Sequence, residues 1–137
     1  GVSPATKVVG VSMSRGAAMK ASLDAGRPVQ IEELPTLADS LGGGIGLDNR
    51  LTFAMCRELL DDVILLSEDE IAAGIRHAYE QEREIVEGAG AVGIGALLAG
   101  KVTAKGPVVA ILSGRNIDMS LHRRIVCGNA ALTERPT

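Results

Sequence analysis

The sequence predicts an α/β fold of three layers with a mostly parallel sheet, and two observations support that prediction. Three short apolar runs, at residues 7–11, 62–66 and 107–112, have the length and composition of buried strands. Helical signals occupy the stretches between them, giving the order strand, helix, helix, strand, helix, helix, strand. This alternation is typical of a parallel sheet that helices cover on both faces.

The first pair of helices is predicted between the first two strands. Residues 16–25 form one helix, and Gly26 ends it because glycine readily adopts the left-handed conformation at a helix C-terminus. The other helix is capped by Asp48 or Asn49 and runs to about residue 60.

The third helix has the clearest start. Ser67 and Glu70 match a capping box, in which each side chain binds a backbone N–H of the first helical turn. Apolar residues then recur at steps of three and four from Ile71 to Ile85. This spacing predicts a helix with one apolar face, packed on the sheet or on another helix.

The fourth helix is predicted at residues 89–99, where almost every side chain is small or aliphatic. Because this stretch lacks a polar face, we expect it to be buried. Close contacts with its neighbours are expected at Gly90, Gly93 and Ala96, and Gly100 is expected to end it.

Length and composition predict one domain with an aliphatic core. The chain has 137 residues, and Phe53 and Tyr79 are its only aromatic residues. A domain of this size buries roughly two-thirds of its unfolded surface, which is enough for a core. We expect the domain to span residues 1–127 and residues 128–137 to form a loose tail.

Charge and cysteine usage exclude several classes of function. The net charge of −3 argues against a nucleic-acid partner, which would favour a strongly basic chain. No apolar run reaches the roughly 18 to 20 residues of a membrane span, and no signal peptide is evident. Cys56 and Cys127 stand far apart without metal-ligand spacing, which predicts reduced thiols and a cytoplasmic protein.

Ser113 is a candidate ligand-binding residue, because ligands of open α/β sheets bind at the carboxyl ends of the strands. It directly follows the apolar run 107–112, and Gly114 allows the backbone to pass close to whatever the hydroxyl touches. The alternative is a Ser-Gly turn whose hydroxyl binds its own backbone. Spacing alone favours that second interpretation.

Other polar and glycine-rich positions have structural interpretations as well as functional ones. Glu87 lies beside a bound cofactor or caps the helix that follows it, and capping is the interpretation that the residues favour. The glycines of residues 42–46 could hold a phosphate of a nucleotide or another anion, but they lack the spacing of known phosphate motifs. His122 and the arginines after it are expected in a solvated basic patch.

Taken together and in order, these segments resemble one enzyme family. The stretch LLDDVILLSEDEIAAGIRHAYEQEREIVEGAGAVGIGALLAGK, the later VVAILSGRNID and the segment Thr36-Leu37-Ala38-Asp39 are similar to the C-terminal half of the threonine dehydratase and serine racemase family. Those proteins are pyridoxal-phosphate enzymes of the tryptophan-synthase-β-like fold, called fold type II. The similarity runs from about residue 7 to residue 118. The segment ADSLGGGIGLDN, residues 38–49, resembles the hydroxyectoine-utilisation branch of dehydratase-like proteins.

The resemblance implies roles for individual residues toward pyridoxal phosphate. It places the Ser113 hydroxyl at the pyridine nitrogen, Glu87 beside the ring, and Ser40 beside the ring oxygen, where the racemase has glycine. Gly114 and Asn116 match the family's S-G-G-N turn, although arginine stands at the second glycine. The implied cofactor contacts are therefore Ser40, Glu87, Ser113, Gly114 and Asn116.

Two departures from the family change what is expected of the chain. The two carboxylates of the family's divalent-cation site are replaced by Ser12 and Ala18, so no metal site is expected. The family's Schiff-base lysine and glycine-rich phosphate loop have no counterpart here. The resemblance thus implies an inactive C-terminal portion of a homodimeric dehydratase that acts on threonine, serine or a hydroxyectoine-derived amino acid. The alternative is a non-catalytic α/β binding or interaction module.

Overall fold

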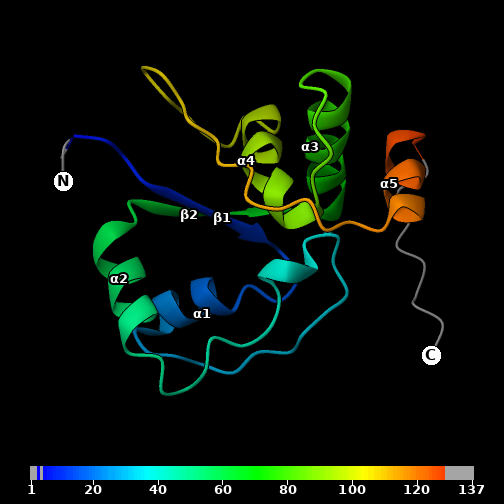
Figure 1. The fold of residues 1–137 in the computed structure, drawn as a ribbon. Helices are drawn as coiled ribbons and strands as arrows, with labels where there is room; N and C mark the ends of the chain where they lie inside the picture. The colour runs from blue at the N-terminus through cyan, green and yellow to red at the C-terminus, as the bar shows by residue number, and fades with distance from the viewer. Residues whose placement is uncertain (1–2, 4, 129–137) are drawn as a thin grey trace.

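The computed structural model describes residue 3 and residues 5–128. Its elements are β1 (Val9–Met13), α1 (Ala18–Ala25), the 3₁₀ helix η1 (Asp39–Leu41), α2 (Leu51–Leu59), β2 (Asp62–Leu66), α3 (Glu68–Glu80), α4 (Gly88–Leu98) and α5 (Met119–Val126). Figure 1 shows β1 and β2 between α1 and α2 on one face and α3 and α4 on the other. The predicted three-layer α/β fold is confirmed.

The two strands pair in parallel, from Val9 opposite Asp62 to Met13 opposite Leu66. The first strand therefore starts two residues later than its apolar run, and it includes Met13. That shift has a reason in the core, because Met13 and Leu66 end the ladder side by side and are both essentially inaccessible to solvent. The crossover between the strands carries α1, η1 and α2.

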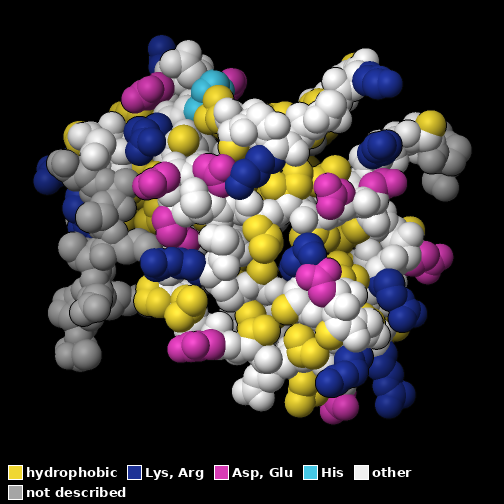
Figure 2. All heavy atoms as spheres, turned by 180° about the vertical axis from the view of Figure 1, so that it is seen from behind, with side chains coloured by type: hydrophobic (Ala, Val, Ile, Leu, Met, Phe, Trp, Pro, Cys, Tyr) yellow, Lys and Arg dark blue, Asp and Glu magenta, His cyan; other side chains and the backbone are white. Residues whose placement is uncertain are grey.

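The prediction of a third strand at residues 107–112 is wrong. Among the described residues the sheet contains β1 and β2 only, so this segment has no ladder to join. Val109 is 88% exposed and Ile111 is 78% exposed. The apolar pattern indicates a segment suited to burial, but it does not show whether a neighbouring strand is present to cover that segment. Apolar side chains also reach the surface on the face shown in Figure 2.

The predicted capping box at the start of α3 is confirmed. The Glu70 amide donates to Ser67 Oγ at 3.3 Å, and the Ser67 amide donates to Glu70 Oε2 at 2.7 Å. The Lys101 ammonium also donates to Glu70, at 2.7 Å, and together these contacts hold the pKa of Glu70 below its usual value. The helix ends at Glu80 rather than reaching Ile85, because the backbone turns at Arg83 with φ of +61°.

Replacing Ser67 by alanine tests this cap. Ser67→Ala removes the acceptor of the Glu70 amide, and we expect a loss of about 1 kcal/mol in the free energy of unfolding. The urea midpoint of the purified chain measures this loss. Ser120→Ala, at an exposed position within α5, is the matched control. Equal midpoints for the two variants would contradict the capping role.

Helices α3 and α4 approach each other through glycine. A Cβ on Gly74 would lie 2.6 Å from the Ala91 carbonyl oxygen, and a Cβ on Gly95 would lie 2.7 Å from the Glu70 carbonyl oxygen. Real carbon atoms do not come so close, so the two backbones meet where side chains are absent. The predicted burial of α4 is confirmed as far as Ala96, whereas Leu97 and Leu98 in its last turn are exposed. Gly100 follows the end of the helix with φ of +66°.

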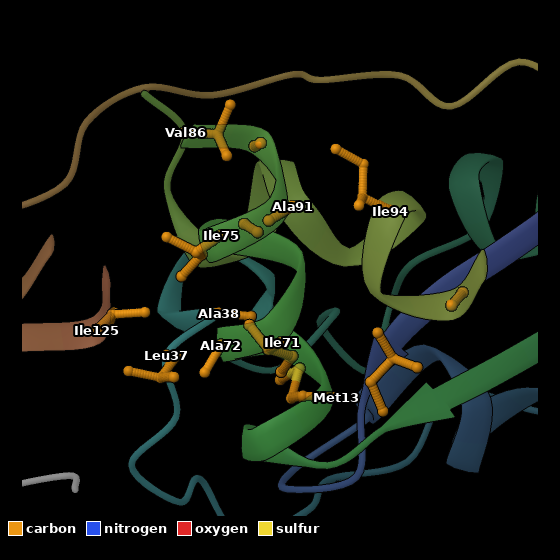
Figure 3. Close-up of a cluster of buried hydrophobic side chains, with 14 residues drawn as sticks. Met13, Leu37, Ala38, Ile71, Ala72, Ile75, Val86, Ala91, Ile94 and Ile125 are labelled. Atoms are coloured by element: carbon orange, nitrogen blue, oxygen red, sulfur yellow. The ribbon is translucent and has the colours of Figure 1, made fainter. Parts of the chain in front are cut away.

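The core is aliphatic, as the composition predicts, and it lies around α3 and α4. Figure 3 shows Ile75 of α3 beside Ala91 of α4 and Ile71 beside Met13, with Ile125 of α5 on the opposite side of α3 from Ala91. The buried cluster consists of Met13, Leu37, Ala38, Leu66, Ile71, Ala72, Ile75, Ala78, Val86, Ala89, Ala91, Ile94, Ala96 and Ile125.

The short helix α5 has no counterpart among the predicted elements, and it corrects the expectation for His122. That side chain is 3% exposed, not solvated, and its ring meets Tyr79 edge-on at 5.1 Å between centroids. No described residue forms a hydrogen bond with His122 Nε2. Burial lowers the pKa of His122 because the charged imidazolium loses its hydration. Of the predicted basic patch, Arg123 and Arg124 are exposed.

This burial predicts a loss of stability in mild acid. In the unfolded chain His122 keeps a pKa of about 6.5, whereas the folded chain favours the neutral ring. The folded state therefore binds fewer protons, and its stability declines as the pH falls below about 6.5. We expect the urea midpoint to fall between pH 7.5 and pH 5.5. His122→Phe, which keeps a ring against Tyr79 but cannot be protonated, should flatten that decline, and an unchanged pH dependence would contradict the prediction.

Two further expectations concern the ends of the chain and its helices. Apart from Gly128, the predicted tail at residues 128–137 lies outside the described residues. None of the helices in the described part of the chain is both long enough and apolar enough to cross a membrane.

Candidate functional site

Three of the five predicted cofactor contacts meet at the start of α4. Glu87 is the N-cap residue of that helix, and its amide donates to the Gly114 carbonyl oxygen at 3.1 Å. Ser40, which lies on η1, donates from its hydroxyl to Glu87 Oε2 at 3.4 Å. In Figure 1 the segment that leads to α5 passes this end of α4. Residues from three distant parts of the chain thus form one group.

Gly114 lies so close to Glu87 that any larger residue would displace the Glu87 side chain. A Cβ at this position would be 1.8 Å from Glu87 Oε1. Gly90, in the first turn of α4, packs against the Gly114 backbone, since its Cβ would be 2.7 Å from the Gly114 carbonyl oxygen. Gly114 therefore lies between the Glu87 side chain and the backbone of α4.

The expectation that Glu87 caps α4 through its carboxylate is wrong. Glu87 occupies the N-cap position, yet its side chain makes no capping hydrogen bond. The carboxylate instead faces Ser40 and Gly114, and the residue is half-buried. The other interpretation, in which Glu87 lies beside a bound cofactor, stays a prediction.

Ser113 and Asn116 are both exposed and lie on the same segment as Gly114. Ser113 ends the extended stretch 107–112, and its hydroxyl makes no hydrogen bond with any described residue. A turn in which this hydroxyl binds its own backbone is therefore not formed. Neither side chain forms a hydrogen bond with Glu87, and the roles of both toward a cofactor stay predictions.

The remaining positions singled out in the sequence have local structural roles. The Ser12 hydroxyl donates to the sulfur of Met13, and Ala18 begins α1. Within the described residues, no three histidine, cysteine, aspartate or glutamate side chains gather closely enough to hold a metal ion. In the loop 42–46, Gly43 and Gly46 have φ of +89° and +80°, so turn geometry accounts for both glycines.

Sequence reasoning missed a turn that supports the site. Thr36, Leu37 and Ala38, here called the 36–38 turn, immediately precede η1 and lie against the first residue of α4. Glu68 of α3 binds this turn with both carboxylate oxygens. No spacing rule links residues more than 30 positions apart, so only the resemblance of the T-x-A-D segment could have drawn attention to it.

A groove of about 580 Å³ lies at the other end of α4, away from this group of residues. Its walls combine the polar residues His77, Glu82 and Glu84 with apolar ones. The segment 107–112 contributes Val108, Ala110 and Leu112 to the apolar part. The start of α4 remains the candidate site, because the predicted cofactor contacts Ser40, Glu87 and Gly114 meet there and none of them lines this groove.

Comparison with known proteins identifies the family. Residues 2–114 match the model of the pyridoxal-phosphate dependent enzyme family. A protein of Sinorhizobium fredii with a provisional threonine dehydratase name is 64% identical over 132 residues, which cover 96% of this chain and 40% of that protein. The L-threonine ammonia-lyase of Thermotoga maritima is 40% identical over 126 residues, which cover 91% of this chain and 31% of the enzyme.

Solved structures agree with this result. The processed form of threonine deaminase isoform 2 from Solanum lycopersicum has a TM-score of 0.78 at 35% identity, covering 96% of this chain and 38% of that one. Maize serine racemase has a TM-score of 0.76 at 26% identity, covering 87% and 37%. The chain thus spans about two-fifths or less of the relatives named here. It belongs to the pyridoxal-phosphate dependent enzymes, with the fold of the type II group.

Proposed function

We propose that this chain supplies the ring-side part of the cofactor site in a longer pyridoxal-phosphate dependent dehydratase. Such an ammonia-lyase removes water from threonine or serine and then releases ammonia. The observation that carries the proposal is the meeting of Ser40, Glu87 and Gly114 at the start of α4. The relatives named as threonine dehydratases and ammonia-lyases support the reaction class.

The residues at this site fit an aromatic ring with polar substituents. Glu87 offers a carboxylate and Ser40 a hydroxyl, which would pair with polar substituents of the ring. Gly114 and Gly90 carry no side chains, and a Cβ on Gly114 would overlap the Glu87 carboxylate, whereas a Cβ on Gly90 would overlap the Gly114 backbone. A few precisely placed polar groups are a usual part of a cofactor pocket.

In this proposal Ser113 binds the ring nitrogen. When bound, pyridoxal phosphate withdraws the electrons that develop at the α-carbon of the amino acid. A neutral serine hydroxyl at the ring nitrogen supports that withdrawal only weakly, which suits loss of a β-hydroxyl better than a long-lived carbanion. Ser40 holds the Glu87 carboxylate beside the ring, and Asn116 completes the turn after Gly114.

The longer enzyme would supply what this chain lacks. In the proposal a lysine and a phosphate loop come from the remainder of the enzyme, so the 137-residue chain alone is inactive. The exposed apolar segment 107–112 supports this view, since Val109 and Ile111 are suited to a covered sheet. We further propose that the longer enzyme is a homodimer. Because the sequence of residues 38–49 resembles the hydroxyectoine-utilisation branch of dehydratase-like proteins, we also propose a hydroxyectoine-derived amino acid as a substrate.

An absorption spectrum of the longer enzyme tests the proposed function. With pyridoxal phosphate added, we expect the band of the bound cofactor, a change in that band on adding L-threonine or L-serine, and release of ammonia. Borohydride reduction should fix the cofactor to the longer enzyme and not to the 137-residue chain. A longer enzyme that binds no cofactor would favour the non-catalytic module instead.

Ser113→Ala tests the assigned ring contact. A single hydrogen bond to a neutral group contributes about 0.5–1.5 kcal/mol, so we expect the dissociation constant of the cofactor to rise roughly three- to tenfold. Ser113→Thr retains a hydroxyl and serves as the control. Fluorescence titration of the longer enzyme measures both values. If the alanine variant binds as tightly as the threonine variant, Ser113 does not contact the ring.

A further inference from the structure

Glu68 does not behave as an acidic residue at a helix start usually does. As the first residue of α3, Glu68 could extend into solvent, where its negative charge would interact favourably with the positive end of the helix dipole. Its carboxylate instead reaches across to the 36–38 turn. Oε1 accepts a hydrogen bond from Thr36 Oγ1 at 2.7 Å, and Oε2 accepts one from the Leu37 amide at 2.6 Å.

These contacts fix the whole turn. The Thr36 hydroxyl that donates to Glu68 also accepts a hydrogen bond from the Ala38 amide, at 3.2 Å. Leu37 is 6% exposed and Ala38 is fully buried, so little water reaches these groups. Hydrogen bonds to a charged acceptor are short and about twice as strong as neutral ones. One carboxylate therefore anchors a buried turn to α3.

The anchored turn in turn sets the geometry of the site. The Leu37 carbonyl oxygen lies against the start of α4, where a Cβ on Gly88 would be 2.0 Å away from it. The Ala38 carbonyl oxygen accepts from the Leu41 amide at 2.9 Å and so closes η1. That 3₁₀ helix carries Ser40, whose hydroxyl reaches Glu87.

We infer that Glu68 is a positioning residue of the cofactor site, which acts through the 36–38 turn to hold Ser40 and Glu87 in place. The inference rests on the proposed function. Glu68 touches neither the ring nor the substrate in this arrangement, and its effect passes through Thr36 and Leu37.

Two kinds of substitution separate this role from a simple charge effect. Glu68→Gln removes one acceptor and leaves either the Thr36 hydroxyl or the Leu37 amide without it. Asp69→Asn removes the same charge one residue later, at an exposed position of the same helical turn. Thr36→Val removes the hydroxyl and nearly preserves the shape, whereas Thr36→Ser keeps the hydroxyl.

Cofactor affinity and amide exchange of the longer enzyme are the two measurements. We expect Glu68→Gln and Thr36→Val to raise the dissociation constant of pyridoxal phosphate by about tenfold or more, the usual cost of losing a group that orients a binding residue. Asp69→Asn and Thr36→Ser should stay within about twofold of the unsubstituted enzyme. In the cofactor-free enzyme, the Leu37 and Ala38 amides should exchange at least tenfold faster after Glu68→Gln, and the Ala38 amide should do so after Thr36→Val as well. Neither amide should change after Asp69→Asn or Thr36→Ser.

The outcomes distinguish the inference from the proposal beneath it. If the unsubstituted longer enzyme binds no pyridoxal phosphate, the proposed function is wrong and the cofactor role of Glu68 is wrong with it. If the unsubstituted enzyme binds and Glu68→Gln binds equally well, only the inference is overturned. Equal effects of Glu68→Gln and Asp69→Asn would also overturn it, because they would reduce its role to helix charge.

Discussion

Gly88→Ala is expected to destabilise the chain by about 3 kcal/mol or more, at the upper end of what overpacking costs. The added Cβ would lie 2.0 Å from the Leu37 carbonyl oxygen and 2.9 Å from the Ala38 nitrogen. Both atoms belong to backbone, so no side-chain rotation relieves the overlap and α4 must move away from the 36–38 turn. This loss is a large part of the 5–15 kcal/mol that typically stabilises a domain.

Chemical unfolding of the purified variants measures this effect. Gly106→Ala is the matched control, because a Cβ there would meet no atom within 4 Å and its backbone is not in the left-handed region. The control should change the free energy of unfolding by less than about 0.5 kcal/mol. A Gly88→Ala variant as stable as the Gly106→Ala variant would show that the start of α4 does not lie against the turn.

Gly114→Ala is expected to damage the site rather than the fold. Here the added Cβ would overlap the Glu87 side chain, 1.8 Å from Oε1 and 2.7 Å from the carboxyl carbon. A flexible side chain can turn aside, so we expect less than about 1 kcal/mol of lost stability. The displaced carboxylate would lose its hydrogen bond with Ser40 and move away from the proposed position of the ring. Cofactor affinity of the longer enzyme should therefore fall by an order of magnitude or more.

A double-mutant cycle tests whether the two residues act together. Glu87→Ala removes the three atoms nearest to the added Cβ, so Gly114→Ala should cost little further affinity when it is made in that background. Titration of the four longer enzymes with pyridoxal phosphate gives the coupling. Additive losses would mean that Gly114 affects binding by a route other than the Glu87 carboxylate.

Local signals in the sequence predict local structure well. The Ser67 capping box and the Gly26 helix end involve contacts within a few residues, and both are confirmed. The all-round apolar composition of residues 89–99 likewise indicates a buried helix, because no polar face is available for solvent. The small residues there also predict the close approach of backbones, although Gly95 and its partner Gly74 carry more of it than the pattern indicates.

Local signals do not predict contacts between residues that are far apart in the sequence. Ser40 and Glu87 meet 47 residues apart, and only the resemblance to a family indicates that they meet. The apolar run at residues 107–112 predicts a third strand because its side chains are suited to burial. Such a run does not indicate whether a neighbouring strand is present to pair with it. The arginines next to His122 in sequence predict a solvent-exposed side chain for it. The prediction is wrong because His122 lies on the same buried face of α5 as Ile125.

The parallel pairing of β1 with β2 has a consequence for how the chain acquires its fold. Residues brought together at the start of this ladder are separated by 53 positions. Closing such a long loop costs entropy before any ladder bond forms, whereas α3 and α4 are neighbours in sequence and can associate early. During synthesis, β1 must therefore wait for some fifty further residues to be added before its partner exists, and we expect the α3–α4 hairpin to gain protection from exchange ahead of the sheet.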